Sequence, residues 1–131
     1  MSAEQQRQLS DDVRSRLSEL SALNPGWFDQ ENPAPFPSSI ERMRRFLLDV
    51  VASWGLPDPS VYPCPDGEIS SQWSVGPWEF DAVTVSGGHR IDLHAVHVET
   101  MAQVESRLGA GDAEQDLATF LAFIGSLRLP A

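Results

Sequence analysis

The side chains best suited to chemistry gather in one stretch, where histidines and carboxylates alternate with apolar residues. They are Glu79, Asp81, His89, Asp92, His94, His97 and Glu99. Because side chains on a strand repeat every two residues, Asp92 and His94 share one face. If the hairpin at Gly87-Gly88 pairs in simple register, Asp81 lies opposite His94. A carboxylate beside a histidine can bind a metal ion or transfer a proton, so His94, Asp81 and Asp92 are the candidate residues for such a site.

The surrounding pattern argues against an enzyme. His97 has the opposite parity to His94, and His89 sits at the turn. The sequence contains no HxH, HExxH or CxxC spacing, no G-x-S-x-G elbow and no glycine-rich phosphate loop. Cys64 lies between two prolines in a rigid extended segment, which indicates a structural thiol. We therefore predict no catalytic residue and no bound cofactor, with a metal or ligand site at His94 as the alternative.

Two other groups are candidates for binding a partner. Arg42 and Arg45 are three residues apart, hence neighbours on one face of a helix, where they could contact an acidic group. The alternative is a solvated face paired with nearby carboxylates. Trp73 and Trp78 bracket the Gly76-Pro77 turn, where they are either core residues or the anchors of a binding surface.

Three helices are expected to position these residues. Residues 3–23 carry one narrow apolar stripe, which predicts a helix. This helix either packs on its own domain or is detached from it and packs on another chain. The Pro-rich residues 24–39 follow as a connecting loop with its aromatic side chains tucked in. A second helix, capped by Ser38 or Ser39, is the central core helix. Asp112 caps the last helix.

Between the second and the last helix the apolar period changes to two, which indicates strands. Short turns separate a strand at residues 61–62 from strands at 69–75, 78–82 and 91–95. Residues 99–108 fit either a helix or an edge strand. The sequence thus predicts an α+β fold, with a four- to five-stranded antiparallel meander sheet packed on one face by helices, in the order α-α-β-β-β-β-(β)-α.

The composition limits the partners and the compartment. Nineteen Asp and Glu against nine Arg, with no Lys, give a net charge of -10. That field repels nucleic acid and anionic lipid and attracts a basic or neutral partner. A single cysteine forms no intramolecular disulfide, and no apolar run approaches the ~20 residues that span a bilayer. We expect one cytoplasmic domain over residues 1–131, bound to another protein or to a second copy of itself, and not to nucleic acid or a membrane.

A pattern in the middle of the chain carries a resemblance. Tyr62-Pro63-Cys64-Pro65-Asp66-Gly67 is followed by Trp73 and then by Gly76-Pro77-Trp78-Glu79. This Y-P-x-P-D-G, W, G-x-W-E pattern resembles small uncharacterised bacterial proteins that look like companions of toxin-type or defence genes, over residues 38–126. The resemblance implies a non-enzymatic antitoxin- or immunity-like role and carries over no catalytic residue.

Three functions are compatible with these patterns. The negative charge and the lack of catalytic motifs favour a protein-binding module of the antitoxin, immunity or adaptor type. The second function is a small metal- or ligand-binding protein, including a hydrolase, that uses His94 and Asp81. The third is an acidic secretion-type chaperone, which ranks last because such chaperones usually interleave a helix between strands. The sheet face that carries Glu79, Asp81, Asp92 and His94 either stays wet or is the working surface.

Overall fold

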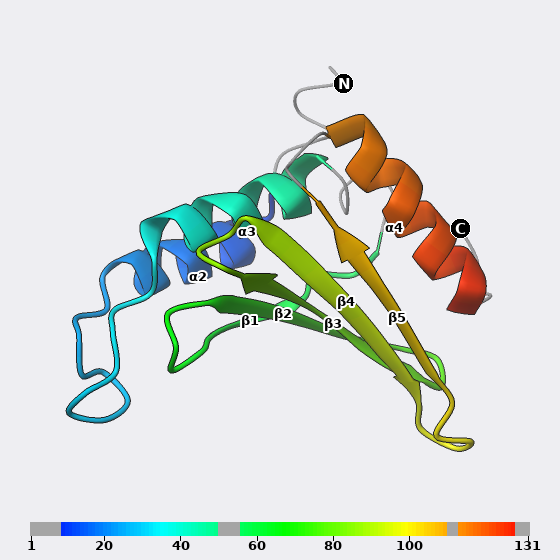
Figure 1. Ribbon diagram of the computed structural model, residues 1–131, viewed down its shortest axis with the longest axis horizontal. Coiled ribbons are helices and arrows are strands. Elements are labelled where there is room, and N and C mark those ends of the chain that lie inside the picture. The colour runs from blue at the N-terminus through cyan, green and yellow to red at the C-terminus, as the bar shows by residue number, and fades with distance from the viewer. Residues whose placement is uncertain (1–8, 50–55, 110–112, 128–131) are drawn as a thin grey trace.

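In the described residues, the fold is a five-stranded antiparallel sheet with three helices in the order α-α-β-β-β-β-β-α, as the sequence predicted. The computed structural model describes residues 9–49, 56–109 and 113–127. The helices are α2 (Asp11–Ser21), α3 (Pro37–Asp49) and α4 (Ala113–Leu127), and the strands are β1 (Ser60–Pro63), β2 (Ile69–Val75), β3 (Trp78–Val85), β4 (Arg90–His97) and β5 (Gln103–Leu108). Figure 1 shows α2 and α3 together over one end of the sheet and α4 beside β5.

The core lies between the sheet and the helices because alternate strand residues are apolar. The buried apolar side chains of the strands are Val61, Ile69, Trp73, Phe80, Ala82, Ile91, Leu93, Ala95 and Leu108. Phe46 of α3 contacts Phe120 of α4 edge to face, with ring centroids 5.6 Å apart. Trp73 stacks on Phe80 at 5.0 Å, and Phe123 of α4 reaches the same Phe80 ring at 6.1 Å. Aromatic contacts therefore join the two helix groups to one sheet face.

The N-terminal helix is not detached. Ser10 caps α2 by accepting a hydrogen bond from the Val13 N–H, and Val13, Leu17 and Leu20 are buried in the core. Arg16 Nε donates to the carbonyl of Val61 in β1 at 2.8 Å. The apolar stripe predicted for residues 3–23 thus packs on its own domain; residues 3–8 of that prediction lie outside the described part of the chain.

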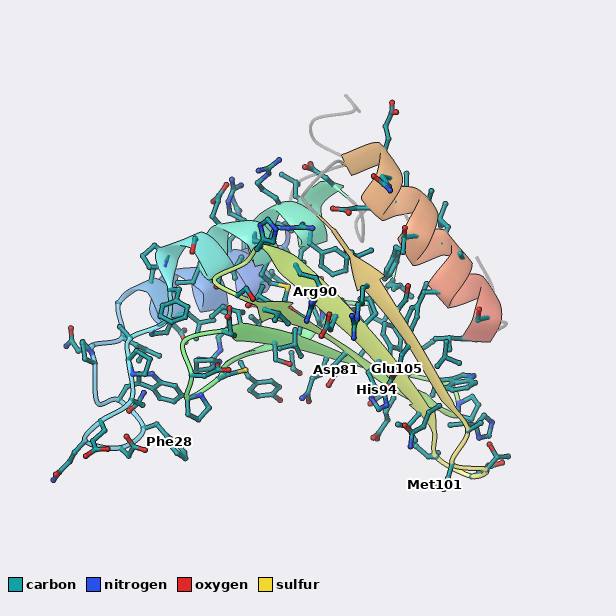
Figure 2. The ribbon with its side chains drawn as sticks, viewed as in Figure 1. Phe28, Asp81, Arg90, His94, Met101 and Glu105 are labelled. Atoms are coloured by element: carbon teal, nitrogen blue, oxygen red, sulfur yellow. The ribbon has the colours of Figure 1, made fainter. Side chains whose placement is uncertain are left out.

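The loop after α2 differs from its expected form at the tip. Asn32 organises it, because its side-chain oxygen accepts hydrogen bonds from the backbone N–H groups of Phe28 and Asp29. The Phe36 ring packs directly on Gly67, and a Cβ atom at position 67 would collide with that ring. Phe28, however, is 64% exposed and stands at the far end of the loop (Figure 2). A loop held by its own polar contacts has no need of that aromatic as an anchor.

Three local predictions are corrected or decided by the structure. Helix α3 begins at Pro37, so Ser38 and Ser39 lie inside its first turn rather than at the cap. The connection at Gly87-Gly88 is a four-residue turn, since Val85 pairs with Arg90. Residues 103–108 form a strand, β5, and not a helix. Asp112, the predicted cap of the last helix, lies outside the described residues.

Within the described ranges, no helix has the length and apolar character required to cross a membrane.

Candidate functional site

The candidate site lies on the sheet face opposite the described helices α2, α3 and α4, which we call the open face. One row of side chains crosses all five strands there, through successive register pairs. It consists of Ser60, Gln72, Asp81, His94 and Glu105. Figure 2 shows Asp81, His94 and Glu105 near the middle of the sheet. The row exists because period-two alternation gives the buried face to apolar residues and the other face to polar ones.

Asp81 and His94 are directly opposite each other on β3 and β4, as the simple hairpin register predicted. Partial burial raises the pKa of the Asp81 carboxyl, and the nearby His94 acts in the opposite direction by favouring the charged form. His94 Nε2 lies 3.1 Å from Gln103 Oε1 on β5. The two side chains are therefore brought together. Desolvation disfavours the charged form of the Asp81 carboxyl, and the nearby imidazole offsets this effect only in part.

Asp92 shares this face but is engaged elsewhere. Its carboxylate accepts hydrogen bonds from Arg90 Nε at 2.8 Å and from Arg90 Nη2 at 3.3 Å. Arg107 on β5 is its register neighbour, with Nε 3.9 Å from the same carboxylate. Arg90 neutralises Asp92, and Arg107 is at longer range, so Asp92 does not combine with His94 and Asp81 in one ligand set.

A hollow of about 520 Å³ opens over this row, and Ser60, Gln72, Asp81 and His94 are among its lining residues. Three carboxylates line it, from Asp58, Glu79 and Asp81, together with the His94 and Tyr62 side chains. Neither lysine nor arginine is among its lining residues. We call these residues the acidic hollow. Among the described residues that line the hollow, His94 is the one side chain able to carry a positive charge, and Arg16 lines the neighbouring hollow that shares Asp58.

The described part of the chain contains no group of three or more His, Cys, Asp or Glu side chains arranged to hold a metal ion. The candidates His94, Asp81 and Asp92 therefore amount to one His–carboxylate pair and one Arg-bound carboxylate. Protein sites for zinc commonly need three or four such ligands. What the pair can do chemically is bind a cation or exchange a proton.

Two of the four partner-binding candidates are occupied inside the protein. Arg42 is 9% exposed, and its Nη2 donates to Asp116 of α4 at 2.9 Å and to the Gly109 carbonyl at 3.1 Å. Trp73 is 4% exposed, and its indole N–H donates to the Pro57 carbonyl at 3.0 Å. Both side chains are largely buried and hydrogen-bonded within the protein, and Trp73 is also a lining residue of the acidic hollow.

The other two candidates are nearer the surface. Arg45 is exposed on α3. Trp78 is half-buried at the end of β3 and contacts the His97 ring edge to face at 5.1 Å. His97 Nδ1 in turn accepts hydrogen bonds from the backbone N–H groups of Glu99 and Thr100, which shape the β4–β5 turn. Trp78 and His97 thus support that turn, and Arg45 is the member of the predicted basic pair that solvent reaches.

Cys64 is half-buried behind β1. Burial and the neighbouring carboxylates of Asp66, Glu68 and Asp81 raise the pKa of its thiol. A thiol with a raised pKa is mostly protonated at neutral pH and is a poor nucleophile. This environment fits the structural role that the sequence indicated.

Sequence reasoning missed two features of the site. Asp58 and Tyr62 line the acidic hollow, although the loop before β1 gave no periodic signal that would place Asp58 there. Asp116 in the first turn of α4 is the buried partner of Arg42, a pairing that the sequence analysis did not predict. A usable signal existed for Asp116, because it precedes Phe120 by four residues and so falls on the buried stripe of α4.

No family model, curated protein or solved structure matches the chain. The site is therefore interpreted from its own residues.

Proposed function

We propose that this protein is a non-enzymatic protein-binding module that takes a basic segment of a partner protein against the acidic hollow. The observation that carries the proposal is the concentration of Asp58, Glu79 and Asp81 in one hollow that no arginine of the described residues lines. Elsewhere on the same face, Asp92 is held by its own arginines. An uncompensated acidic concavity attracts a positively charged partner and sets its orientation.

The state of Asp81 supports the same proposal. Its raised pKa means that the surroundings disfavour the charged carboxylate. A lysine or arginine side chain placed in the hollow would supply the missing opposite charge. Sites that are unfavourable in the free protein and relieved by a ligand are typical of binding surfaces. Antitoxin, immunity and adaptor proteins are the classes to which such a module would belong.

The test is comparative capture from a lysate of the native host. Three forms serve as bait: the wild type, a hollow variant with Asp58→Asn, Glu79→Gln and Asp81→Asn, and a control variant with Glu31→Gln, Glu99→Gln and Glu114→Gln. Both variants lose three negative charges, but the control residues are exposed and lie outside the hollow. The captured protein is then produced separately and titrated against each form.

We expect a stoichiometric partner that binds the wild type and the control alike and the hollow variant at least roughly tenfold more weakly, because close interfacial charge pairs carry more than about 1.4 kcal/mol in such complexes. Affinity for the wild type should also fall with added salt. The proposal is wrong if no stoichiometric partner is captured, or if the hollow variant binds it as tightly as the control does.

Small-ligand binding at the same hollow is the second candidate, and the His94–Asp81 pair is the observation that favours it. A ligand bound there would raise the melting temperature of the wild type and not of Asp81→Asn. A screen of divalent cations and small amines by thermal shift, with protein purified without a histidine tag, distinguishes this function from partner binding.

The secretion-type chaperone stays third. Residues 60–108 contain five consecutive strands and no inserted helix, and this range is described throughout. Chaperones of that type usually place a helix between strands, so the topology supports the module over the chaperone.

A further inference from the structure

The two edges of the sheet differ in how they are protected. At β1, Arg16 Nε of α2 donates to the outward carbonyl of Val61, and Pro63 ends the strand. At β5, no side chain or backbone group of the described residues hydrogen bonds to the outer side of Gln103, Glu105 or Arg107. An unprotected edge strand is a template for pairing with another chain.

The hydrogen-bond phase of β5 follows from the turn before it. The His97 N–H donates to the Ala102 carbonyl at 2.9 Å. Hydrogen-bonded pairs in an antiparallel ladder recur at every second residue. Backbone groups of Val104, Ser106 and Leu108 therefore face β4, and those of Glu105 and Arg107 face outward. The outward residues also carry their side chains on the open face.

This hydrogen-bond pattern limits the registers in which two copies of β5 can pair antiparallel about a two-fold axis. Residues whose backbone groups face outward must lie opposite residues of the second copy whose backbone groups also face outward. Centring the ladder on Glu105 or on Arg107 places like charges opposite each other, which is destabilising. Centring the ladder on Ser106 places Glu105 of each copy opposite Arg107 of the other copy, which gives two oppositely charged pairs. The same register places Val104 of each copy opposite Leu108 of the other. Arg107 is available for this because its side chain is 73% exposed and its contact with Asp92 is long, at 3.9 Å.

Helix α4 lies beside β5 and offers a second surface for the same contact (Figure 1). From Leu117 to Leu127 it contains no charged residue. Its exposed positions in that range include Ala118, Leu121, Ala122 and Gly125, with Leu121 38% exposed. A helix that is apolar all round is usually buried. Because the two-fold axis of this pairing stands perpendicular to the sheet, the α4 helices of both copies lie on the same side.

We infer that the chain forms a two-fold dimer through β5, in which the two sheets become one continuous sheet and the two α4 helices cover the junction. The occupant of this edge is a second copy because the charge pattern of β5 is complementary to itself in the one register centred on Ser106. The acidic hollow is next to β1, at the opposite side of the sheet, so it stays open in the dimer.

The first experiment is a charge swap followed by mass measurement in solution, with sedimentation equilibrium or light scattering. Glu105→Arg and Arg107→Glu each place like charges opposite each other at both symmetry-related pairs. The double variant Glu105→Arg with Arg107→Glu restores opposite charges. We expect the wild type and the double variant to be dimers, and each single variant to have a dimer dissociation constant at least roughly tenfold higher.

The second experiment fixes the register. In a Cys64→Ser background, Ser106→Cys places two thiols across the two-fold axis in a non-hydrogen-bonded pair, where Cα atoms are about 4.5 Å apart and a disulfide can form. Val104→Cys is the matched control, because it lies on the same face two residues away and its thiols would be too far apart. We expect rapid oxidative cross-linking of Ser106→Cys only.

Leu121→Glu tests the helix contact separately, and circular dichroism of every variant checks that the fold is intact. We expect Leu121→Glu to weaken the dimer without unfolding the monomer. The inference is overturned if the wild type is monomeric at every concentration reached, if the single charge variants dimerise as the wild type does, or if both cysteine variants cross-link equally. These readouts do not involve the acidic hollow, so their failure leaves the proposed function untouched.

Discussion

Glu68 and Asp81 are two carboxylates close to the same sheet, and their surroundings differ completely. Glu68 lies on the helix side, where Ser39 Oγ and Thr84 Oγ1 donate to one of its oxygens at 2.6 and 2.9 Å and the Gly87 N–H donates to the other at 2.9 Å. Asp81 lies on the open face, and no hydrogen-bond donor among the described residues reaches its carboxylate. The first carboxylate is fully satisfied and the second is not.

This difference separates a group of side chains that stabilises the fold from the hollow that we propose as the binding site. The helix side holds two groups of buried polar side chains, which we call together the helix-side polar cluster. Ser39, Glu68 and Thr84 join α3 to β3 and the β3–β4 turn, and the Arg42–Asp116 pair joins α3 to α4. Most polar atoms of these side chains are hydrogen-bonded, although the buried Nε of Arg42 has no partner among the described residues. Hydrogen-bonded polar groups inside a core stabilise one arrangement of it. The acidic hollow holds three carboxylates, with neither lysine nor arginine among its described lining residues. Breaking the first should unfold the protein, and breaking the second should remove binding and leave the fold.

The largest effect is expected for Arg42→Met. This change leaves Asp116 buried without its cation, which should lower the free energy of unfolding by about 3–5 kcal/mol in urea denaturation. Arg44→Met is the control, because Arg44 pairs with Glu41 on the surface and should cost less than about 1 kcal/mol. Adding Asp116→Leu to Arg42→Met should recover much of the loss. Equal losses in the single and the double variant would show that the ion pair is not the cause.

A smaller loss is expected for Glu68→Gln. An amide group replaces one acceptor oxygen by a donor, so either the Gly87 N–H or the hydroxyl pair loses its acceptor. We expect a loss of about 1–3 kcal/mol in the free energy of unfolding, measured in the same way. Glu79→Gln, an exposed residue of the acidic hollow, should change stability by less than about 0.5 kcal/mol. Similar values for both variants would remove the distinction between cluster and hollow.

The smallest effect is expected for Asp81→Asn, and it has the opposite sign. Because the folded-state pKa of Asp81 is raised, the native state binds more protons than the unfolded state between the two pKa values, and stability falls as pH rises through that window. Above it the charged carboxylate is unfavourable, so Asp81→Asn should raise stability at neutral pH by at most about 1 kcal/mol. At pH values below the window the two proteins should be equally stable. A destabilised Asp81→Asn at neutral pH would contradict this account.

Much of the fold was predictable because period and turn signals agree in the middle of the chain. The alternation in residues 69–75 and 78–82, with Gly76-Pro77 between them, predicts the strand pair that the structure contains. Residues 99–108 stayed open because Met101, Val104 and Leu108 fit a helical period by chance. Pairing with β4 decides in favour of a strand, as backbone groups of a neighbouring strand need partners.

The candidate site was predictable in part. Register and alternation were enough to place Asp81 opposite His94. Asp92 was grouped with His94 correctly by face, but its capture by Arg90 and Arg107 depends on side-chain geometry across β5, a strand whose existence was undecided. Arg42 was expected at a surface because arginines usually lie there, and its partner Asp116 is 74 residues away in the chain.

The sequence by itself determined the meander, the apolar face of each helix and the negative charge, because these depend on local periodicity and composition. Tertiary structure alone decided which charged groups are buried in pairs, which carboxylates stay uncompensated in the hollow, and which edge of the sheet is left unprotected. Those outcomes depend on contacts between residues far apart in the chain, and no local pattern encodes the distance between them.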